Sequence, residues 1–562
     1  MESANAPGRT GFLVETQQLP RTWLTEKRAW IGSRGVILLS LVLHLLFCWQ
    51  WSDYDLAQDE AHYWDWSRHL DWSYYSKGPL VAWIIAGSTW VLGDLAQSWT
   101  GSMTAAVRTP AVIFGTLLIW CLVRLGEVLF QSKRLGLLIA VSCLCIPPIA
   151  AVSTIMTIDS PYTCSWAAAL LCAWWALNRP GWLPWVILGV IVGLGILAKY
   201  TMVVFFPSLG LFLLFRASKR RHLIEPGLWI SALVALLCIT PILYWNYLHA
   251  GVTFKHVGNL AGVTHDQTKH LLGPLKYLGE QAALLLGYWF VLWFWAMIEF
   301  RPGRPKQENE QADGIAYLWW MSAPMFLLFF GFSIRTGGGE VNWPVAAYLA
   351  GLPLALHFLA ARYREGTPRF RAMTAGFLTF FLGLGLALTL IVHKSDLVYP
   401  LMIKLLPAAT EEDPAPLRRL DPVCRLRGWK YLATQIDVLR DELSASGKEP
   451  ILAATHWSIP GELGFYCQGH PQAYSIGPLA GDRHSQYDLW KNPVDHPEVF
   501  LGRDFIIVGG LPKDLHGSFA QVLPSTQVRF EMPGGYIITN WPVQVARGFK
   551  GFPKAEKPER SF

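Results

Sequence analysis

The chain first turns strongly apolar in the stretch VILLSLVLHLLFCWQW, residues 36–51, and the acidic and aromatic stretch SDYDLAQDEAHYWDW, residues 52–66, follows at once. A helix over the first stretch approaches the thickness of a hydrocarbon core, which is about 30 Å. Comparable apolar runs recur at residues 135–152 and 372–392, and they stop at about residue 407. This pattern predicts a bundle of membrane helices followed by a separate tail.

Composition supports a membrane protein. Hydrophobic residues make up 52% of the 562 residues and charged residues 15%, whereas an average soluble protein has about a quarter charged residues. The net charge of +7 sits mainly in short clusters between apolar runs, so it indicates topology rather than a nucleic-acid partner. The polar segment up to Arg34 lacks a cleavable signal pattern, and we expect residues 36–51 to remain as an anchor.

Run lengths predict a polytopic α-helical protein with about eleven spanning helices plus juxtamembrane helices. The expected spans are residues 35–51, 108–129, 135–153, 160–177, 183–198, 201–215, 227–246, 281–300, 315–333, 344–360 and 372–392. Residues 80–93 form a run of only about fourteen apolar residues, and we expect a helix lying at the membrane interface there. The expected organisation is a cytoplasmic segment 1–34, a membrane domain 35–406 with a first outer loop 52–107, and an extracytoplasmic domain 407–562.

Basic residues test this topology. With the N-terminus in the cytoplasm, every predicted inside loop is basic, as the positive-inside rule requires. These loops carry Lys27, Arg28, Arg34, Lys133, Arg134, Arg179, Arg216, Lys219, Arg220, Arg221, Arg301, Arg304, Lys306, Arg362, Arg364, Arg369 and Arg371. An odd number of spans then places the tail outside.

The tail reads as a soluble α/β domain. Its pattern predicts a helix over residues 429–444 and strands near residues 450–455, 504–508 and 536–539. Seven of the nine cysteines lie in apolar runs, where cysteine usually acts as a small hydrophobe. The other two, Cys424 and Cys467, lie in the tail and would pair only if the compartment is oxidising and they are close.

Acidic residues open the first outer loop. Asp59 and Glu60 precede an apolar face at Tyr63, Trp66 and Leu70, a spacing that fits a short helix. Both acids have a structural interpretation, as a helix N-cap and a favourable first-turn carboxylate. A carboxylate just outside the first span also suits a general base in a transfer reaction.

Three further ionisable residues share the predicted outer face. Asp159 begins a helix and is followed by Pro161, so it is either an N-cap or a second catalytic acid. Lys199 closes an apolar run, where it either snorkels to the interface or binds an anion. Lys77 lies in a turn on the same side. Two lysines facing two aspartates favour a phosphate handled beside a carboxylate base.

Seven motifs, taken in order, resemble one family. They are DEAHYW (59–64), YYSKGPL (74–80), VRTPA (107–111), TIDSP (157–161), GILAKY (195–200), NWPVAAY (342–348) and SQYDLW (485–490). Their order and topology resemble the GT-C-fold membrane glycosyltransferases related to aminoarabinose transferase and the protein O-mannosyltransferases, of the glycosyltransferase family 39/83 type. The resemblance covers most of the chain.

The resemblance implies an inverting glycosyltransferase of the bacterial inner membrane. Its donor would be a polyprenyl-phosphate-linked sugar, and its acceptor a lipid, glycan or protein at the outer face. Asp59 corresponds to the loop aspartate that acts as general base and Asp159 to the second acidic position. Lys77 and Lys199 match basic positions near the donor phosphate, where cations stabilise the leaving group. The other candidate substrate contacts are Glu60, Tyr63, Tyr75, Tyr200, His265, Asn342 and Trp343.

No cofactor is assigned from the sequence. Relatives often have an acidic residue or a histidine near the position of Lys77, whereas this chain reads SKGP at residues 76–79, so a metal site built there does not carry over. His256, His265 and His270 lie in a later outer loop, where a solvated histidine is the commoner case. The 28 tryptophans are explained first by interfacial belts.

A transporter or lipid flippase without chemistry is the alternative function. Transporters typically carry internal repeats and place charged groups near the bilayer midplane. In this sequence the ionisable candidates gather at one face, which favours the enzyme.

Overall fold

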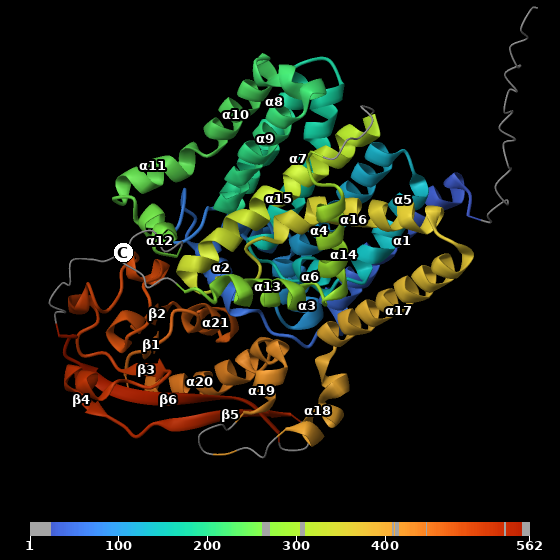
Figure 1. Ribbon diagram of the computed structural model, residues 1–562. Coiled ribbons are helices and arrows are strands. Elements are labelled where there is room, and N and C mark those ends of the chain that lie inside the picture. Colours follow the sequence, from blue (N-terminus) through green and yellow to red (C-terminus); the bar gives the residue numbers. More distant parts are fainter. Residues whose placement is uncertain are drawn as a thin grey trace, which may run out of the picture.

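The computed structural model describes residues 24–260, 270–303, 310–406, 410, 415–445, 447–532 and 536–553. A helical bundle holds α1 to α17, and a smaller domain of helices and one sheet lies against one end of that bundle (Figure 1). The tail domain is orange and red in Figure 1, and α17 runs from the bundle toward it. The helical membrane fold with a C-terminal sheet domain is as the sequence predicted.

The bundle and the first loop are helical almost throughout. Their α-helices are α1 (Glu26–Leu46), α2 (Gln58–Arg68), α3 (Leu80–Thr100), α4 (Thr104–Phe130), α5 (Lys133–Leu144), α6 (Pro147–Val152), α7 (Asp159–Asn178), α8 (Leu183–Ala198), α9 (Phe205–Phe215), α10 (Pro226–Cys238), α11 (Thr240–Leu248), α12 (Val252–Leu260), α13 (Gly273–Leu284), α14 (Tyr288–Glu299), α15 (Glu310–Thr336), α16 (Val345–Glu365) and α17 (Pro368–His393). A π-helical turn, η1 (Phe47–Trp51), extends α1, and the 3-10 helices η2 (Tyr200–Val204) and η3 (Ala217–Leu223) precede α9 and α10.

Six described helices are long and apolar enough to cross a membrane: α1 with its extension, α3, α4, α15, α16 and α17. Two bent pairs, η3 with α10 and α13 with α14, raise the number to eight if each is one span. The sequence predicted about eleven. The difference arises because the expected span 135–153 is broken between α5 and α6, because α8 and α9 are short, and because the 20-residue helix α7 is not among the helices apolar enough to cross. Helix α3 adds one candidate that was not expected.

Helix α3 differs from its expectation. Residues 80–93 were predicted as a short interfacial helix ending at Gly93 and Asp94, but the helix continues to Thr100 and has 21 residues. It ends at Gly101, whose φ of 70° suits glycine at a helix C-terminus. At this length α3 is long enough to cross the bilayer by itself.

Ion pairs gather at the bundle end farther from the tail. The carboxylate of Glu127 near the end of α4 pairs with Arg34, with Arg124 at 2.5 Å and with Lys133 at 3.1 Å. Asp313 at the start of α15 pairs with Arg216 after α9. Arg34, Lys133 and Arg216 are among the residues predicted to face the cytoplasm, whereas Arg124 falls within a predicted span. The side of the membrane on which they lie stays a prediction.

One six-stranded sheet organises the tail. Its strands are β1 (Ile451–Ala454), β2 (Ala473–Ser475), β3 (Phe505–Val508), β4 (Phe519–Val522), β5 (Thr526–Met532) and β6 (Tyr536–Phe549). The order is β2-β1-β3-β6-β4, with β5 also paired to β6. Strands β1, β2 and β3 are parallel, and β6 runs antiparallel to β3, β4 and β5.

Helices α20 (Trp429–Ser444) and α21 (Ile459–Tyr466) pack beside this sheet. The predicted helix at residues 429–444 matches α20, and the strand predicted near residues 504–508 matches β3. Cys424 and Cys467 are both buried and both free, so the pairing left open by the sequence does not occur in this structure.

Helix α21 docks the tail onto α2 of the first loop (Figure 1). The contact is backbone to backbone at Gly461, where a Cβ would lie 2.7 Å from the carbonyl of Ala61 and 2.8 Å from the nitrogen of His62. Beside it the Trp64 and Phe465 rings meet edge to face, with centroids 4.9 Å apart. A residue larger than glycine therefore cannot occupy position 461 without moving α21 away from α2.

We predict that Gly461→Ala loosens the tail. Alanine favours the helix by about 1 kcal/mol relative to glycine, but overpacking against fixed backbone costs roughly 1–3 kcal/mol. Thermal unfolding in detergent should show a lower midpoint, and limited proteolysis should release the tail faster. Gly517→Ala is the matched control, because nothing lies within 4 Å of a Cβ at that glycine. Identical proteolysis of the two variants would contradict this account of the docking.

Candidate active site

Asp159 joins three chain segments at the bundle end nearer the tail. It begins α7, and its Oδ1 accepts a hydrogen bond from Lys199 Nζ at 2.7 Å, directly after α8. Its Oδ2 accepts one from Asn342 Nδ2 at 2.7 Å, shortly before α16. The carboxylate therefore uses both oxygens, and the ion pair with Lys199 is largely buried, with 9% and 7% of the two residues exposed.

Lys77 is held beside this pair by a tight approach. A Cβ on Gly78 would lie 2.1 Å from the carbonyl oxygen of Leu197, so only glycine lets the turn rest on the end of α8. The turn closes on itself through a hydrogen bond from Tyr74 N to the carbonyl of Lys77, at 3.2 Å. This contact brings Lys77 close to Lys199, and burial, followed by the charge of Lys199, lowers the pKa of Lys77.

Two other segments fix the same turn. The backbone nitrogen of Tyr75 donates to Gln486 Oε1 in the tail at 2.7 Å. Thr253 Oγ1, on α12, donates to the carbonyl of Tyr74 at 3.1 Å. The SKGP turn is thus positioned jointly by the bundle, the α12 loop and the tail.

Glu60 forms a buried ion pair with Arg108. Arg108 Nη2 lies 2.8 Å from Glu60 Oε2, and the side chains are 2% and 0% exposed. Glu60 also accepts hydrogen bonds from the backbone nitrogens of Ala57 and Met156, each at 2.8 Å. Glu60 was expected to contact substrate, but the structure buries it as a clamp between the first loop, α4 and the approach to α7.

Asp59, next to Glu60 in the chain, lies in a different environment. Its side chain is exposed, although residues 60–66 of α2 are buried. Within the described residues it has no hydrogen-bond or ion-pair partner, and its charge interacts with Lys77, Arg483 and Asp159. We call Asp59, Lys77, Asp159, Lys199, Asn342 and Arg483 the charged cluster.

The protein surroundings shift the pKa values of this cluster. Loss of bulk solvation near the surrounding protein raises the pKa of Asp59, and Lys77 partly offsets that rise. Burial together with Lys199 lowers the pKa of Lys77 to about 8. Burial also lowers the pKa of His62 to about 3, so this imidazole is neutral at ordinary pH. Asp59 is thus the carboxylate of the cluster that has no hydrogen-bond or ion-pair partner among the described residues.

The other residues predicted to contact substrate differ in burial. Tyr63 is buried on α2, where burial and the charges of Asp59 and Asp159 raise its pKa. Tyr75 is buried against His256, with ring centroids 4.8 Å apart. Tyr200 and Trp343 are half-buried and pack against the bundle core. His265 lies outside the described residues.

Sequence reasoning missed two residues of this region. Arg108 was quoted in a motif but given no role, because its partner lies 48 positions away. Arg483 comes from the tail, two residues before the SQYDLW motif, and its adjacency to that motif was the available signal. Among the described residues no group of three or more His, Cys, Asp and Glu side chains is placed to hold a metal ion.

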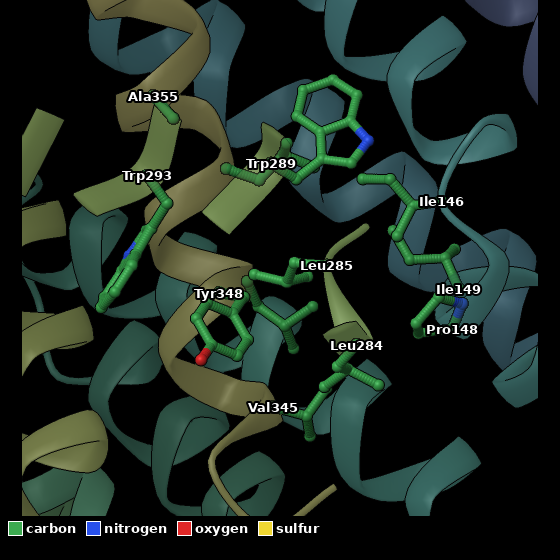
Figure 2. Close-up of a pocket in the computed structure, with 12 residues that line it drawn as sticks. Ile146, Pro148, Ile149, Leu284, Leu285, Trp289, Trp293, Val345, Tyr348 and Ala355 are labelled. Carbon is green, nitrogen blue, oxygen red and sulfur yellow. The ribbon is translucent and has the colours of Figure 1, made fainter. Parts of the chain in front are cut away.

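Apolar cavities lie in the bundle below Asn342. A narrow one of ≈ 50 Å³ begins at Val345 and is lined by residues of α13, α14 and α16 and of the α5–α6 region (Figure 2). A larger one of ≈ 580 Å³ lies between α14, α16 and α17 and shares Trp289 with the first. Its wall includes Phe370 and Phe377, which are 45% and 67% exposed, so it opens at the side of the bundle.

Comparisons with known proteins agree with the fold. A family model described as dolichyl-phosphate-mannose-protein mannosyltransferase matches residues 76–245. The lipid A galacturonosyltransferase RgtD of Rhizobium johnstonii is 26% identical over 331 residues, which are 59% of this chain and 66% of that protein. The structure of ArnT from Cupriavidus metallidurans bound to undecaprenyl phosphate shares the fold, with a TM-score of 0.58 at 12% identity over 92% of this chain and 97% of that one. The family resemblance predicted from the motifs is confirmed.

We predict that breaking the clamp destabilises the whole protein. Arg108→Met leaves the Glu60 carboxylate buried and unpaired, which typically costs about 3–5 kcal/mol. The double variant with Glu60→Gln should lose less than the single variant, because no buried charge remains. Denaturant titration in detergent measures both, and Asp94→Asn on the exposed face of α3 is the control. A loss below about 1 kcal/mol for Arg108→Met would show that the clamp is not needed for stability.

Proposed function

This chain has the GT-C fold and carries a domain of a mannosyltransferase family, and we propose that it transfers a sugar, with inversion, from a polyprenyl-phosphate donor to an acceptor hydroxyl or phosphate. The acceptor is a cell-envelope lipid, glycan or protein. The lipid A enzyme among its relatives makes an envelope lipid the first acceptor to test. The reaction takes place at the periplasmic face of the bacterial inner membrane, with the N-terminus in the cytoplasm.

One observation carries this proposal. Asp59 and Lys77, charges of opposite sign without hydrogen-bond or ion-pair partners among the described residues, face each other beside the Lys199–Asp159 pair at one end of a membrane bundle. Asp59 is exposed and Lys77 is half-buried, and ionisable groups that stay without a protein partner at the end of a membrane bundle suggest a functional role. A transfer reaction requires this combination, because one group must take a proton while another faces the departing phosphate.

Asp59 is the general base in this scheme. It takes the proton from the acceptor hydroxyl as the oxygen attacks the anomeric carbon of the donor sugar, and the bond from that carbon to the phosphate oxygen breaks. A raised pKa makes Asp59 a stronger base than an ordinary aspartate. The electron pair leaves with the polyprenyl phosphate.

Lys77 is the cation that faces the leaving phosphate. Lys199 contributes its charge from the end of α8, while Asp159 holds Lys199 and Asn342 in place. Asp159 therefore positions these groups rather than serving as a second base. Fixed cations at developing negative charge stabilise the transition state more than they do the ground state.

The apolar cavities suit the lipid part of the donor. The smaller begins at Val345, three residues after Asn342, the larger opens at the side of the bundle at α17, and the two share Trp289 in their walls. The larger volume is within the usual range for ligand pockets, about 300–1,000 Å³. A polyprenyl chain that occupied these cavities would place its phosphate at the charged cluster.

We predict that Asp59→Asn lowers the transfer rate by roughly 10²- to 10⁴-fold, the usual contribution of a general base. The assay uses purified protein with a labelled polyprenyl-phosphate sugar and an envelope-lipid extract as acceptor. Asp94→Asn is the matched control, because that aspartate is exposed on α3. Undiminished transfer by Asp59→Asn with normal folding would show that Asp59 is not the base.

We predict an alkaline loss of activity near pH 8. Lys77 must be protonated to face the phosphate, and its pKa is lowered to about 8, so its charge disappears as the pH rises through that value. Lys77→Arg keeps the charge to much higher pH and should move the alkaline limb of kcat/KM upward. Lys513→Arg, an exposed tail lysine, should leave the profile unchanged. An identical alkaline limb in wild type and Lys77→Arg would exclude Lys77 as its origin.

A further inference from the structure

Arg483 is an exposed cation in the tail, between η6 (Gly477–Ala480) and η7 (Gln486–Asp488). Among the described residues its side chain has no hydrogen bond and no ion pair. Its guanidinium carbon lies 4.0 Å from the centroid of the Trp457 ring. The backbone nitrogen of Trp457 donates to Asp482 Oδ2 at 2.7 Å, which ties the ring to this loop. Stacking orients the guanidinium plane and leaves its N–H groups free.

The Trp457 ring places Arg483 beside the first turn of α2. That ring meets the ring of His62, with centroids 5.3 Å apart. His62 follows Asp59 by three residues, and side chains at this spacing are neighbours on a helix surface. The stack of Arg483 on Trp457 therefore lies next to the face of α2 that carries Asp59.

The same loop of the tail also fixes the turn that carries Lys77. Gln486 follows Arg483 by three residues, and its Oε1 accepts a hydrogen bond from the backbone nitrogen of Tyr75 at 2.7 Å. Tyr75 precedes Lys77 by two residues. Arg483 thus lies beside Asp59 as well as Lys77, and its charge acts on the pKa of each.

The charges of the cluster balance only when a singly charged anion is bound. Asp59 and Asp159 are negative, and Lys77, Lys199 and Arg483 are positive, so the site without a ligand has one positive charge in excess. A sugar phosphodiester carries one negative charge and makes the site neutral. Lys199 pairs with Asp159, and Lys77 faces the phosphate in the proposed function. Asp59 and Arg483 are the two charges that remain.

We propose that Arg483 is the counter-ion of Asp59 once the donor is bound, and that it keeps this base ionised for catalysis. This inference rests on the proposed function. Without a donor, the charges of Lys77 and Arg483 both act on Asp59. A bound phosphate then offsets the charge of Lys77, while the surrounding protein continues to favour the neutral carboxyl. Arg483 is the cation left to hold Asp59 in its charged form.

Arg483 also lies near the charge that moves during transfer. Asp59 takes the proton of the acceptor hydroxyl and becomes neutral, while the bond from the anomeric carbon to the phosphate oxygen breaks and the phosphate gains a second negative charge. The total charge of the site is unchanged, but one negative charge has passed from the side of Asp59 to the side of Lys77. A fixed cation beside both positions stabilises the transition state between them.

The test is the pH dependence of transfer by Arg483→Gln. The charge of Arg483 lowers the pKa of Asp59 and that of Lys77, so its removal raises both. The acid limb of kcat should therefore move to higher pH, and the alkaline limb of kcat/KM should move in the same direction. On the acid side kcat should fall roughly 10- to 100-fold, the worth of a charged contact, and it should recover as the pH rises.

Three further variants assign the effect to the charge. Arg483→Lys keeps a cation and should keep both limbs close to those of wild type. Arg529→Gln removes an exposed arginine from β5, and it should leave the profile unchanged. In an Asp59→Asn background, Arg483→Gln should lower the residual rate by less than about twofold, because no carboxylate is left to be kept ionised. Thermal unfolding checks that each variant folds.

The opposite outcomes overturn the proposal. Limbs that stay in place in Arg483→Gln, or a loss by the same factor at every pH, would give Arg483 a structural role only. Limbs displaced equally in Arg483→Lys would show that the effect does not follow the charge. Failure of the proposed function is distinct: Asp59→Asn would transfer at the wild-type rate, or wild type would bind polyprenyl phosphate and transfer no sugar.

Discussion

The ion pair between Glu60 and Arg108 is the constraint on which the candidate site depends. One carboxylate ties together the first loop, helix α4 and the peptide nitrogen of Met156, which leads into α7. Asp59 precedes Glu60 on the same helix, and Asp159 follows Met156 by three residues. The Glu60–Arg108 ion pair therefore fixes the segments that carry both acids of the charged cluster. An unmatched charge in that location would be costly, which is why the clamp needs a buried arginine rather than a mobile lysine.

Much of the fold and part of the site follow from the sequence. The convergence of Asp59, Lys77, Asp159 and Lys199 was predictable because each lies at a segment end and the basic loops assign those ends to one face. The different environments of Asp59 and Glu60 could not be predicted, because the sequence does not show which of two adjacent acids is buried. Glu60 is the buried one because it pairs with Arg108, 48 positions away. The extent of α3 was also missed, because Asp94 looks like a helix end whereas Gly101 is the residue that stops it. Arg483 acquires its place only through tail docking, a long-range contact that local patterns do not encode.

Three parts of the chain contribute to the charged cluster. The bundle supplies the Asp159–Lys199 pair and Asn342, and the first loop supplies Asp59 and Lys77. The tail adds Arg483 and fixes the Lys77 turn through Gln486. Because α21 rests on the backbone of α2 at Gly461, a shift of the tail would change both the geometry and the charge balance around Asp59. The domain beside the bundle is in this sense part of the site and not an appendage to it.

The side opening between α14, α16 and α17 has a consequence for how the protein meets a lipid. Exposed Phe370 and Phe377 form part of the cavity wall, so an apolar chain can enter sideways without passing through water. Encounter then becomes diffusion in two dimensions, governed by surface density in the bilayer instead of molarity in solution. Diluting the membrane with detergent or inert phospholipid would lower the surface density of the lipid that enters the cavity, even when its total amount in the sample is constant.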